Sequence, residues 1–443
     1  MTDSSAPAVI IMGTDLYALA SCRRQGFEVV MVRGFEAYDS SPVDFPEDVT
    51  VLLVEDQRNP EDILSALDRA GLRHRRFAGI QTSYERYLTT IGLLAQHLGC
   101  RAIDPDTAVK FRDKWIQKRE IRRAGISTAQ CTFVPDLRDL EHADQLPYPR
   151  AVLKPYAGGG AALTAVVSSP AELRQAARTF RGRQRSARHF VLEEYIDGDE
   201  WVADGIVADG RVEFVAMAAY AEPCVRVVEN QSPLMVRRLD PTHDAEAYTA
   251  AEPVVQGAIS ALGLRDGVFH MELFHQPETG RVVFGECGAR RGGGLVQEAV
   301  LHKFGVDLAD AEVRCAVGAP LELAPKVRPE AVGSTHLMAG SGILVGCPTP
   351  DEVMTQPGVV FALLDMPHGS TVKAIESTSA RVGRALVVGD SPDELLGRME
   401  AVNAWFGRAC QVAPAGATKR ELIQWQQATW PDAGFGPRTY SVD

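Results

Sequence analysis

The chain has 443 residues, of which 45% are hydrophobic and 23% charged, and its net charge is −12. That length predicts several lobes rather than one core, and the negative charge argues against a nonspecific nucleic-acid or anionic-membrane partner. The eight cysteines show no CxxC spacing, which argues against a disulfide frame or a zinc site. Residues 1–7 do not resemble a secretory signal, and no apolar run reaches membrane-spanning length. We therefore expect a reducing, cytoplasmic location.

The first part of the chain alternates short apolar strands with helices. Strands are predicted at 8–12, 27–32, 51–55 and 77–82, and helices at 16–24 and 60–70. This alternation predicts a parallel sheet with helices on both faces, as in a Rossmann-like domain. Gly13 follows the first strand, but Thr14 and Asp15 come next, so the G-x-G-x-x-G pattern of a dinucleotide site is absent. A tight strand-to-helix turn is the favoured reading of Gly13.

The middle of the chain changes to α+β patterning. One amphipathic helix is predicted over 111–124, a loop or short helix over 136–149, and short strands with glycine turns from 151 onward, interrupted by a helix at 170–180. A further helix is predicted at 250–262, followed by a hairpin of strands 268–274 and 281–286. The stretch 320–329 is rich in proline and charge, which indicates a linker before mixed strands and helices at 330–412.

The first candidate motif is a lysine at the end of a strand, followed by a glycine run. Lys154 precedes Gly158, Gly159 and Gly160. Glycines let backbone N–H groups approach a phosphate chain, and the lysine adds a positive charge. The order differs from a P-loop, in which the glycines come first. A strand, a turn and an exposed lysine fit the same pattern.

The second motif is an acidic segment beside apolar residues, namely Glu193, Glu194, Tyr195, Ile196 and, further on, Glu200. A backbone segment of this kind can read the edge of an adenine base, while a carboxylate binds the ribose hydroxyls. A solvated acidic hairpin is the competing interpretation.

The third motif is a pair of glutamates on the predicted hairpin. If the strands pair, Glu272 and Glu286 lie side by side, and two facing carboxylates with phosphate oxygens suit Mg²⁺. Arg290 and Arg291 follow, and they could neutralise a phosphate or a substrate carboxylate. A surface salt-bridge cluster is the alternative, which the apolar strand and three trailing glycines disfavour.

These three motifs, in this order and with Lys114 upstream in Asp113-Lys114-Trp115, resemble the ATP-grasp superfamily over residues 110–315. The whole chain looks like the L-amino-acid ligase and carnosine-synthase branch. The C-terminal stretches 340–346, 357–359 and 381–385 are similar to the last domain of that branch, more loosely.

The resemblance implies a multidomain α/β and α+β protein with an ATP-grasp fold. The expected segments are an N-terminal Rossmann-like domain at 1–110, a small ATP-grasp subdomain with a glycine-rich lid at 111–190, a large subdomain with the metal site at 191–325, a C-terminal lobe at 326–413 and a tail at 414–443.

The resemblance also implies roles for individual residues. Glu272 and Glu286 would bind Mg²⁺, with Mn²⁺ as an alternative, and Arg290 would act with Lys154 in catalysis. Many members carry Asn two residues after the second glutamate, where this chain has Gly288. Because of this departure, the resemblance leaves open whether the site binds one or two metal ions. ATP would be bound by the following residues: Lys114, Lys154, Gly158, Gly159, Gly160, Glu193, Glu194, Tyr195, Ile196 and Glu200.

Three further residues are weaker substrate candidates. His270 shares a strand face with Glu272, two residues away. A polar residue that only packs near the metal site would give the same sequence pattern. Arg291 could bind a carboxylate. Glu229 could bind an α-amino group, although a loop carboxylate is usually only solvated.

The function implied is that of an ATP-dependent carboxylate–amine ligase, which forms an amide or peptide bond through an acyl phosphate. Small-molecule acids and amines would be its partners, with an amino acid among them, and dimers are frequent in this branch. Two kinds of alternative stay open. The enzyme could use another nucleophile, in purine-type, carboxylating or thioester-forming chemistry. The chain could also be a nucleotide-binding regulatory protein without turnover, a reading that only Gly288 supports.

Overall fold

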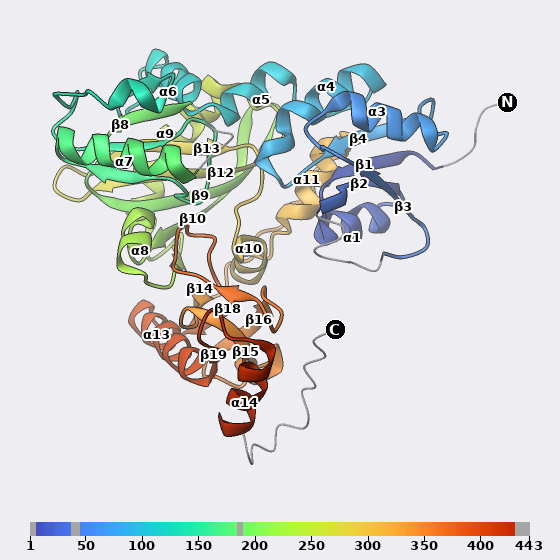
Figure 1. Cartoon of the computed structure of the whole chain (residues 1–443). Coiled ribbons are helices and arrows are strands. Elements are labelled where there is room, and N and C mark those ends of the chain that lie inside the picture. The colour runs from blue at the N-terminus through green and yellow to red at the C-terminus, as the bar shows by residue number, and fades with distance from the viewer. Residues whose placement is uncertain (1–5, 37–44, 184–188, 430–443) are drawn as a thin grey trace. The chain divides into compact units, whose positions relative to one another are not determined.

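The computed structural model describes residues 6–36, 45–183 and 189–429 (Figure 1). The chain divides into two compact units. The first unit comprises Met1–Gly158, Thr164–Ala218 and Leu239–Val327, and the second comprises Gly159–Leu163, Ala219–Arg238 and Arg328–Asp443. The boundary after Val327 falls in the stretch predicted as a linker. The five segments expected from the sequence stay a prediction, since this division is coarser.

The N-terminal sheet of the first unit is parallel, as predicted. Its strands lie in the order β3-β2-β1-β4, and β1 is buried at every position. Because the order reverses between β1 and β4, the carboxyl ends of these two strands flank the crevice where ligands bind in open α/β sheets. The elements are β1 (Ala8–Met12), α1 (Leu16–Arg24), β2 (Glu28–Gly34), β3 (Val49–Val54), α3 (Pro60–Arg69), β4 (Phe77–Gln81), η1 (Glu85–Tyr87) and α4 (Leu88–Leu98).

The helix predicted over 111–124 is confirmed for 114–123, but its predicted start is wrong, because residues 111 and 112 belong to a separate helix. The structure has two helices here, α5 (Pro105–Arg112) and α6 (Lys114–Arg123). Asp113 separates them with an extended backbone (φ −98°, ψ 106°), and its side chain accepts the N–H of Ile116. Aspartate favours such a cap over a helix interior because its short carboxylate binds the free N–H groups of the first turn. The break makes Lys114 the first residue of α6.

The next part of the first unit is a small antiparallel sheet with strand order β5-β8-β6-β7. Its strands and helices are β5 (Cys131–Val134), η2 (Leu137–Leu140), β6 (Ala151–Pro155), β7 (Ala165–Val167), α7 (Pro170–Arg183) and β8 (Phe190–Glu194). The predicted strands, the helix and the short helical turn near 137 are confirmed. β6 and β8 pair directly, which places Lys154 opposite Val191, whereas Glu193 of β8 lies opposite Val152.

The remaining strands of the first unit form an antiparallel layer in the order β13-β12-β9-β10. Ile206, Phe214, Val268, Val300 and Phe304 form part of the core that joins this layer to helices. The elements are β9 (Asp199–Ala208), β10 (Arg211–Tyr220), α9 (Ala245–Leu262), β12 (Gly267–Gln276), β13 (Arg281–Gly288), α10 (Val296–Phe304) and α11 (Leu308–Val317).

The second unit has its own core, to which Leu337, Val387, Leu395 and Phe406 contribute. Its strands form the runs β11-β14-β18-β16 and β17-β15-β19. Of the tail at 414–443, residues 414–429 are described and include a helix at 419–429, and residues 430–443 lie outside the described residues. The elements are α8 (Cys224–Asn230), β11 (Met235–Arg238), β14 (Ala331–Leu337), β15 (Gly342–Gly346), α12 (Pro350–Met354), β16 (Val359–Leu364), β17 (Thr371–Val372), β18 (Gly383–Gly389), α13 (Pro392–Ala409), β19 (Gln411–Ala413) and α14 (Lys419–Thr429).

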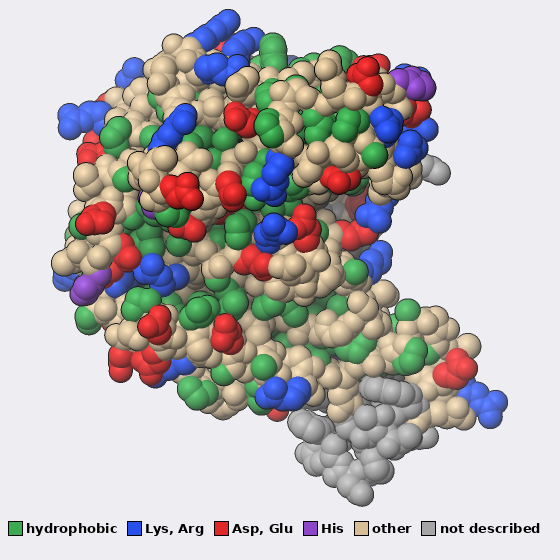
Figure 2. Space-filling model, turned by 90° about the vertical axis from the view of Figure 1, so that its left-hand side faces the viewer, with side chains coloured by type: hydrophobic (Ala, Val, Ile, Leu, Met, Phe, Trp, Pro, Cys, Tyr) green, Lys and Arg blue, Asp and Glu red, His purple; other side chains and the backbone are tan. Residues whose placement is uncertain are grey.

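The surface carries charges of both signs. On the face drawn in Figure 2, Lys and Arg side chains are interspersed with Asp and Glu. Over the described ranges, no helix has the length and apolar character needed to cross a membrane.

Candidate active site

The β12–β13 hairpin places two glutamates opposite each other. Glu272 and Glu286 are direct cross-strand partners, so the predicted pairing is confirmed. The register shifts after Glu272, where Gly285 is the additional residue. A Cβ at Gly285 would lie 2.8 Å from the carbonyl oxygen of Glu272, so the backbone geometry that aligns the two carboxylates depends on glycine.

The two carboxyls differ strongly in acidity. Burial, together with the neighbouring carboxylates of Glu286 and Glu200, raises the pKa of Glu272 well above its usual range. Burial alone would also raise the pKa of Glu286, but Lys114 and Lys154 lower that pKa to about 2. A divalent cation would relieve the crowding of negative charge at Glu272. The pair therefore fits Mg²⁺, which binds oxygen ligands and takes the rest of its shell from phosphates or water.

Among the described residues, no group of three or more His, Cys, Asp and Glu side chains is arranged to hold a metal ion. The candidate magnesium site therefore consists of two protein carboxylates. At Gly288, where the resemblance led us to expect Asn, a Cβ would lie 3.3 Å from a carboxylate oxygen of Glu85. A larger residue at 288 would have to displace the Glu85 side chain.

Two of the predicted lysines meet at this pair of glutamates. Lys114 Nζ lies 3.1 Å from Glu286 Oε2 and donates to the carbonyl oxygen of Gly158 at 2.8 Å. Lys154 Nζ lies 3.0 Å from Glu193 Oε2 and 3.5 Å from Glu286 Oε2. Burial would lower the pKa of Lys154, but Glu193 and Glu286 outweigh it and raise that pKa, which keeps the ammonium charged. The structure thus brings the lysines and glutamates of all three motifs together.

A third lysine belongs to the same cluster and was missed in the sequence. Lys118 is 1% exposed, and its Nζ lies 3.4 Å from Glu193 Oε2. Burial lowers the pKa of Lys118, and Glu193 partly offsets that effect. Lys118 stands one helical turn after Lys114, so spacing alone places both on one face of α6. This four-residue spacing from Lys114 is the feature of the sequence from which Lys118 could have been predicted.

The acidic segment of the second motif splits into buried and accessible parts. Glu193 is 4% exposed, and its Oε1 has no hydrogen-bond partner among the described residues. Glu194 Oε2 accepts the N–H of Gln130 at 3.3 Å, and the guanidinium of Arg150 stacks on the Tyr195 ring at 3.9 Å from its centroid. The buried Oε1 is an acceptor that a ligand N–H could satisfy. Ile196 follows β8, and the buried Glu200 lies in β9, opposite Phe274 of β12.

The glycine run extends across the boundary of the two units. Gly158 belongs to the first unit, whereas Gly159 and Gly160 belong to the second. The carbonyl of Gly160 accepts the N–H of Thr378 at 2.8 Å. The Gly160 backbone has φ +64°, and a Cβ there would lie 2.9 Å from Ser379 Oγ. Both the conformation and the space therefore require glycine at position 160.

Helix α6 is joined to β13 by one side chain. Gln117 is 2% exposed, donates to the Cys287 carbonyl at 2.8 Å and accepts the Cys287 N–H at 2.9 Å. The Gln117 side chain thus pairs with the backbone of the edge strand β13 in the way that a neighbouring strand would. They tie the helix that carries Lys114 and Lys118 to the strand that carries Glu286.

Replacing Gln117 by alanine is expected to loosen this edge. Gln117→Ala leaves the N–H and C=O of Cys287 without partners, at about 1–3 kcal/mol for each buried group. Hydrogen exchange over 281–288 should accelerate at least about tenfold, since 1.4 kcal/mol corresponds to that factor. The exposed Gln175 of α7 provides the control Gln175→Ala. Unchanged exchange in β13 would show that the side chain does not hold the strand.

Arg290 lies beside Glu85, a second residue that the sequence reading missed. Arg290 Nη2 is 3.2 Å from Glu85 Oε2, and Arg112 Nη1 is 2.8 Å from Glu85 Oε1. Glu85 follows the carboxyl end of β4, the edge at which such sheets bind ligands. Its position after β4 is the only feature of the sequence that could have pointed to Glu85. A carboxylate between two arginines holds Arg290 near the end of β13.

Arg291, predicted as a weak substrate residue, lies in a different environment. Its guanidinium is 7% exposed and contacts the carboxylates of Asp15 and Glu312, the latter at 2.8 Å. These two acids outweigh burial and raise the pKa of Arg291. Asp15 also caps α1 by accepting the N–H of Ala18. These contacts favour a structural ion-pair cluster that joins Arg291 to the start of α1 and to α11, and the substrate role stays a prediction.

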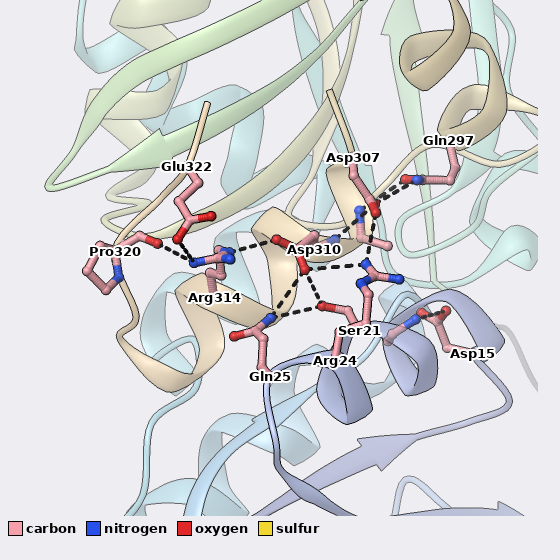
Figure 3. A network of polar contacts seen from close by, with 12 residues as sticks. Asp15, Ser21, Arg24, Gln25, Gln297, Asp307, Asp310, Arg314, Pro320 and Glu322 are labelled. Carbon is pink, nitrogen blue, oxygen red and sulfur yellow. Dashed lines mark hydrogen bonds and ion pairs between the residues drawn. The ribbon is translucent and has the colours of Figure 1, made fainter. Parts of the chain in front are cut away.

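Polar contacts also join α1 to α11 and its first turn. Figure 3 shows Ser21 and Arg24 of α1 facing Asp310 of α11 and Asp307, the residue that caps the start of α11. Ser21 Oγ donates to Asp310 Oδ1 at 2.7 Å, and Arg24 Nη2 lies 3.1 Å from Asp307 Oδ2. Arg314 binds the other oxygen of Asp310 at 2.6 Å. The N-terminal sheet is thereby attached to α11 within the first unit.

Glu312 should give the first unit a characteristic pH dependence. Burial raises its pKa from 4.5 to about 7, against the opposing effect of Arg291. Because the folded-state pKa exceeds the unfolded one, stability is full below pH 4.5 and decreases as the pH rises to about 7. We expect Glu312→Gln to lack this decrease, measured as the unfolding midpoint against pH. Glu322→Gln, which removes an exposed partner of Arg314, is the control; parallel profiles for wild type and Glu312→Gln would contradict the assignment.

The other two weak candidates have their own partners. His270 Nδ1 lies 2.7 Å from Oδ1 of the fully buried Asp204. Asp204 belongs to β9, the strand next to β12, and it orients the His270 imidazole. Glu229 is in α8 of the second unit, and its carboxylate lies 3.0 Å from the guanidinium of Arg226. Their substrate roles stay predictions.

Known proteins resemble this chain in both sequence and structure. A model described as an ATP-grasp domain matches residues 147–298, and one described as L-amino acid ligase C-terminal domain 2 matches residues 335–404. The L-arginine-specific L-amino acid ligase of Bacillus subtilis is 24% identical over 313 residues, 70% of this chain and 74% of that protein. Carnosine synthase 1 of Mus musculus is 23% identical over 68% of this chain and 38% of that protein.

The structural comparison agrees on the fold. The crystal structure of an L-amino acid ligase from Bacillus licheniformis superimposes with a TM-score of 0.73 at 20% identity, covering 93% of this chain and 99% of that one. The carboxylate pair and lysine cluster lie within or beside the matched ATP-grasp domain. The chain therefore carries an ATP-grasp domain, followed by a domain that matches the C-terminal domain 2 of the L-amino acid ligases.

Proposed function

We propose that this chain is an ATP-dependent carboxylate–amine ligase that forms an amide or peptide bond through an acyl phosphate, with an amino acid as a substrate. The observation that carries the proposal is the pairing of Glu272 with Glu286 beside Lys114 and Lys154. The amino-acid substrate is inferred from two similar proteins, an L-amino acid ligase and a carnosine synthase. Eight cysteines without disulfides support a reducing, cytoplasmic location.

ATP would lie between the lysine cluster and the carboxylate pair. Lys114 and Lys154 would bind its phosphates, and the glycines at 158–160 would cover them. The segment 193–196 would contact the adenine, with Glu193 Oε1 available to accept an N–H, and Glu200 would bind the ribose. Mg²⁺, or Mn²⁺ in its place, would be held by Glu272 and Glu286 and would neutralise phosphate charge.

The reaction would proceed in two steps. A carboxylate oxygen of the acid attacks the γ-phosphorus of ATP, the bond to the β-phosphate oxygen breaks, and ADP leaves. The amine nitrogen then attacks the acyl carbon and loses a proton to the departing phosphate or to solvent, and phosphate leaves with both electrons of the broken C–O bond. Arg290 would stabilise the oxyanion and the departing phosphate. The glycine segment 158–160 would keep water away from the acyl phosphate.

Phosphate release from MgATP tests this proposal. Purified protein would be assayed with single amino acids and with pairs, and products would be identified by mass spectrometry. Release of ADP and phosphate only when an acid and an amine are both present supports a ligase. ATP binding without release for any pair would contradict it.

A further inference from the structure

A charged residue is buried in the middle of the apolar strand β9. Between positions 201 and 207, Asp204 is the only charged residue, and it is fully buried. Its side chain pairs with His270, which lies directly opposite on β12, and Asp204 Oδ1 is 2.7 Å from His270 Nδ1. Burying a carboxylate is costly even when it is paired. A strand that keeps such a group among apolar residues often does so for a functional reason.

The backbone of Gly292, in the loop that follows β13, packs directly against this pair. A Cβ on Gly292 would lie 2.6 Å from His270 Nδ1 and 2.8 Å from Asp204 Oδ1. It would also lie 2.7 Å from a methyl group of Val296, the first residue of α10. The φ of Gly292 is outside the left-handed region, so it is the close approach that requires glycine here. The buried pair therefore fixes where this part of the loop lies.

The peptide that joins Arg291 to Gly292 also binds the guanidinium of Arg290. Arg290 Nη1 donates to the carbonyl oxygen of Arg291 at 2.7 Å, and Arg290 Nη2 lies 3.2 Å from Glu85 Oε2. The guanidinium is thus held from two sides, by a carboxylate and by a carbonyl. The carbonyl belongs to the peptide whose next Cα packs against the buried pair. A displacement of Gly292 would therefore move an atom that Arg290 binds.

The next glycine lacks these contacts. A Cβ on Gly293 would meet no heavy atom within 4 Å, and Gly293 is exposed. Its φ is also outside the left-handed region, so alanine is compatible with the backbone there. Two adjacent glycines of one loop therefore differ in their approach to the buried pair, and they form a matched comparison.

We propose that Asp204 and His270 are positioning residues, which set the place of the Arg290 guanidinium through the Arg291–Gly292 peptide. This assignment rests on the proposed ligase function, in which Arg290 stabilises the oxyanion and the departing phosphate. Such stabilisation depends on donors that are in place before the charge develops. A shift of the loop should therefore lower kcat and leave the KM for ATP unchanged.

Gly292→Ala tests the assignment, with Gly293→Ala as its control. We expect Gly292→Ala to lower kcat at least about tenfold, equivalent to about 1.4 kcal/mol, because its Cβ cannot fit unless the loop moves. Gly293→Ala should keep the wild-type kcat. Thermal unfolding of both variants shows whether they are folded. If Gly292→Ala does not fold, His270→Ala takes its place, since it removes the ring beneath the loop, and the same loss in kcat is expected.

Combining these variants with Arg290→Ala separates positioning of Arg290 from a general structural role. If the buried pair acts through Arg290, the substitution at 292 has no guanidinium left to displace. In the Arg290→Ala background, Gly292→Ala should then change single-turnover phosphate release by no more than about twofold, because the two effects are not additive. An equal loss in both backgrounds would mean that the pair acts independently of Arg290.

Three outcomes overturn the assignment while the ligase function stands. They are equal kcat for Gly292→Ala and Gly293→Ala, an equal loss with and without Arg290, and a KM for the acid or amine that rises in His270→Ala with kcat unchanged. If no acid–amine pair supports turnover, or Arg290→Ala is too slow to measure, crystal structures of wild type and Gly292→Ala decide separately. An Arg290 guanidinium displaced from Glu85 supports the assignment, and an unchanged guanidinium overturns it.

Discussion

Glu286→Gln is expected to lower ATP-dependent phosphate release by about a thousandfold, a typical loss when one preorganised electrostatic group is removed. The substitution keeps the shape of the side chain but removes its charge. It would take away half of the carboxylate pair proposed for Mg²⁺ and the anion that Lys114 contacts at 3.1 Å. The measurement is single-turnover phosphate release at saturating MgATP and substrates.

The control for this variant lies on the same hairpin. Glu278 is exposed in the turn between β12 and β13, so Glu278→Gln removes one negative charge without touching the site. It should release phosphate at the wild-type rate. If Glu286→Gln and Glu278→Gln behaved alike, the carboxylate pair would not be the metal site. A thermal unfolding curve for each variant shows whether a loss of activity comes from the altered site or from an unfolded protein.

Arg290→Lys is expected to lower kcat by about a hundredfold while the KM for ATP stays near the wild-type value. Lysine keeps the positive charge and can still pair with Glu85, but it cannot present two parallel N–H donors to an oxyanion or phosphate. Because those donors would matter most in the transition state, the loss should appear in kcat.

Arg281→Lys gives the matched control for Arg290→Lys. Arg281 begins the same strand, is exposed, and contacts Ser127 rather than the site. Its kcat should equal that of wild type. A normal kcat for Arg290→Lys, or a loss confined to the KM for ATP, would remove Arg290 from the proposed chemistry.

Local sequence patterns predicted most of the fold because strand alternation and turn residues act over short ranges. The parallel opening sheet and the β12–β13 hairpin follow from apolar runs bounded by glycine and proline. The pattern failed at Asp113, where hydrophobic periodicity continued across a residue whose side chain caps a new helix. A capping bond to Ile116 leaves no trace in a hydrophobicity pattern.

The candidate site was predictable where its residues stand in recognisable motifs. Lys114, Lys154, Glu272 and Glu286 come from separate segments and meet as the resemblance implied. Glu85 belongs to no such motif, and its nearness to Arg290 arises only from the three-dimensional fold.

Tertiary packing also decides the environment of Arg291 and Lys118. Arg290 and Arg291 are equivalent as neighbours in a sequence, yet one lies beside Glu85 and the other is buried between Asp15 and Glu312. Lys118 becomes part of the cluster only because α6 packs on β13. Burial and ion pairing of this kind arise from long-range contacts.

The acyl phosphate is the central claim, and isotope transfer tests it most directly. The acid substrate would carry ¹⁸O in its carboxylate and be incubated with the chain, an amine and MgATP, and the released phosphate would be analysed by mass spectrometry. The account predicts one ¹⁸O atom in each phosphate formed with product, because the carboxylate oxygen that attacks the γ-phosphorus leaves with it. Unlabelled phosphate, or label found in AMP, would contradict the acyl-phosphate mechanism.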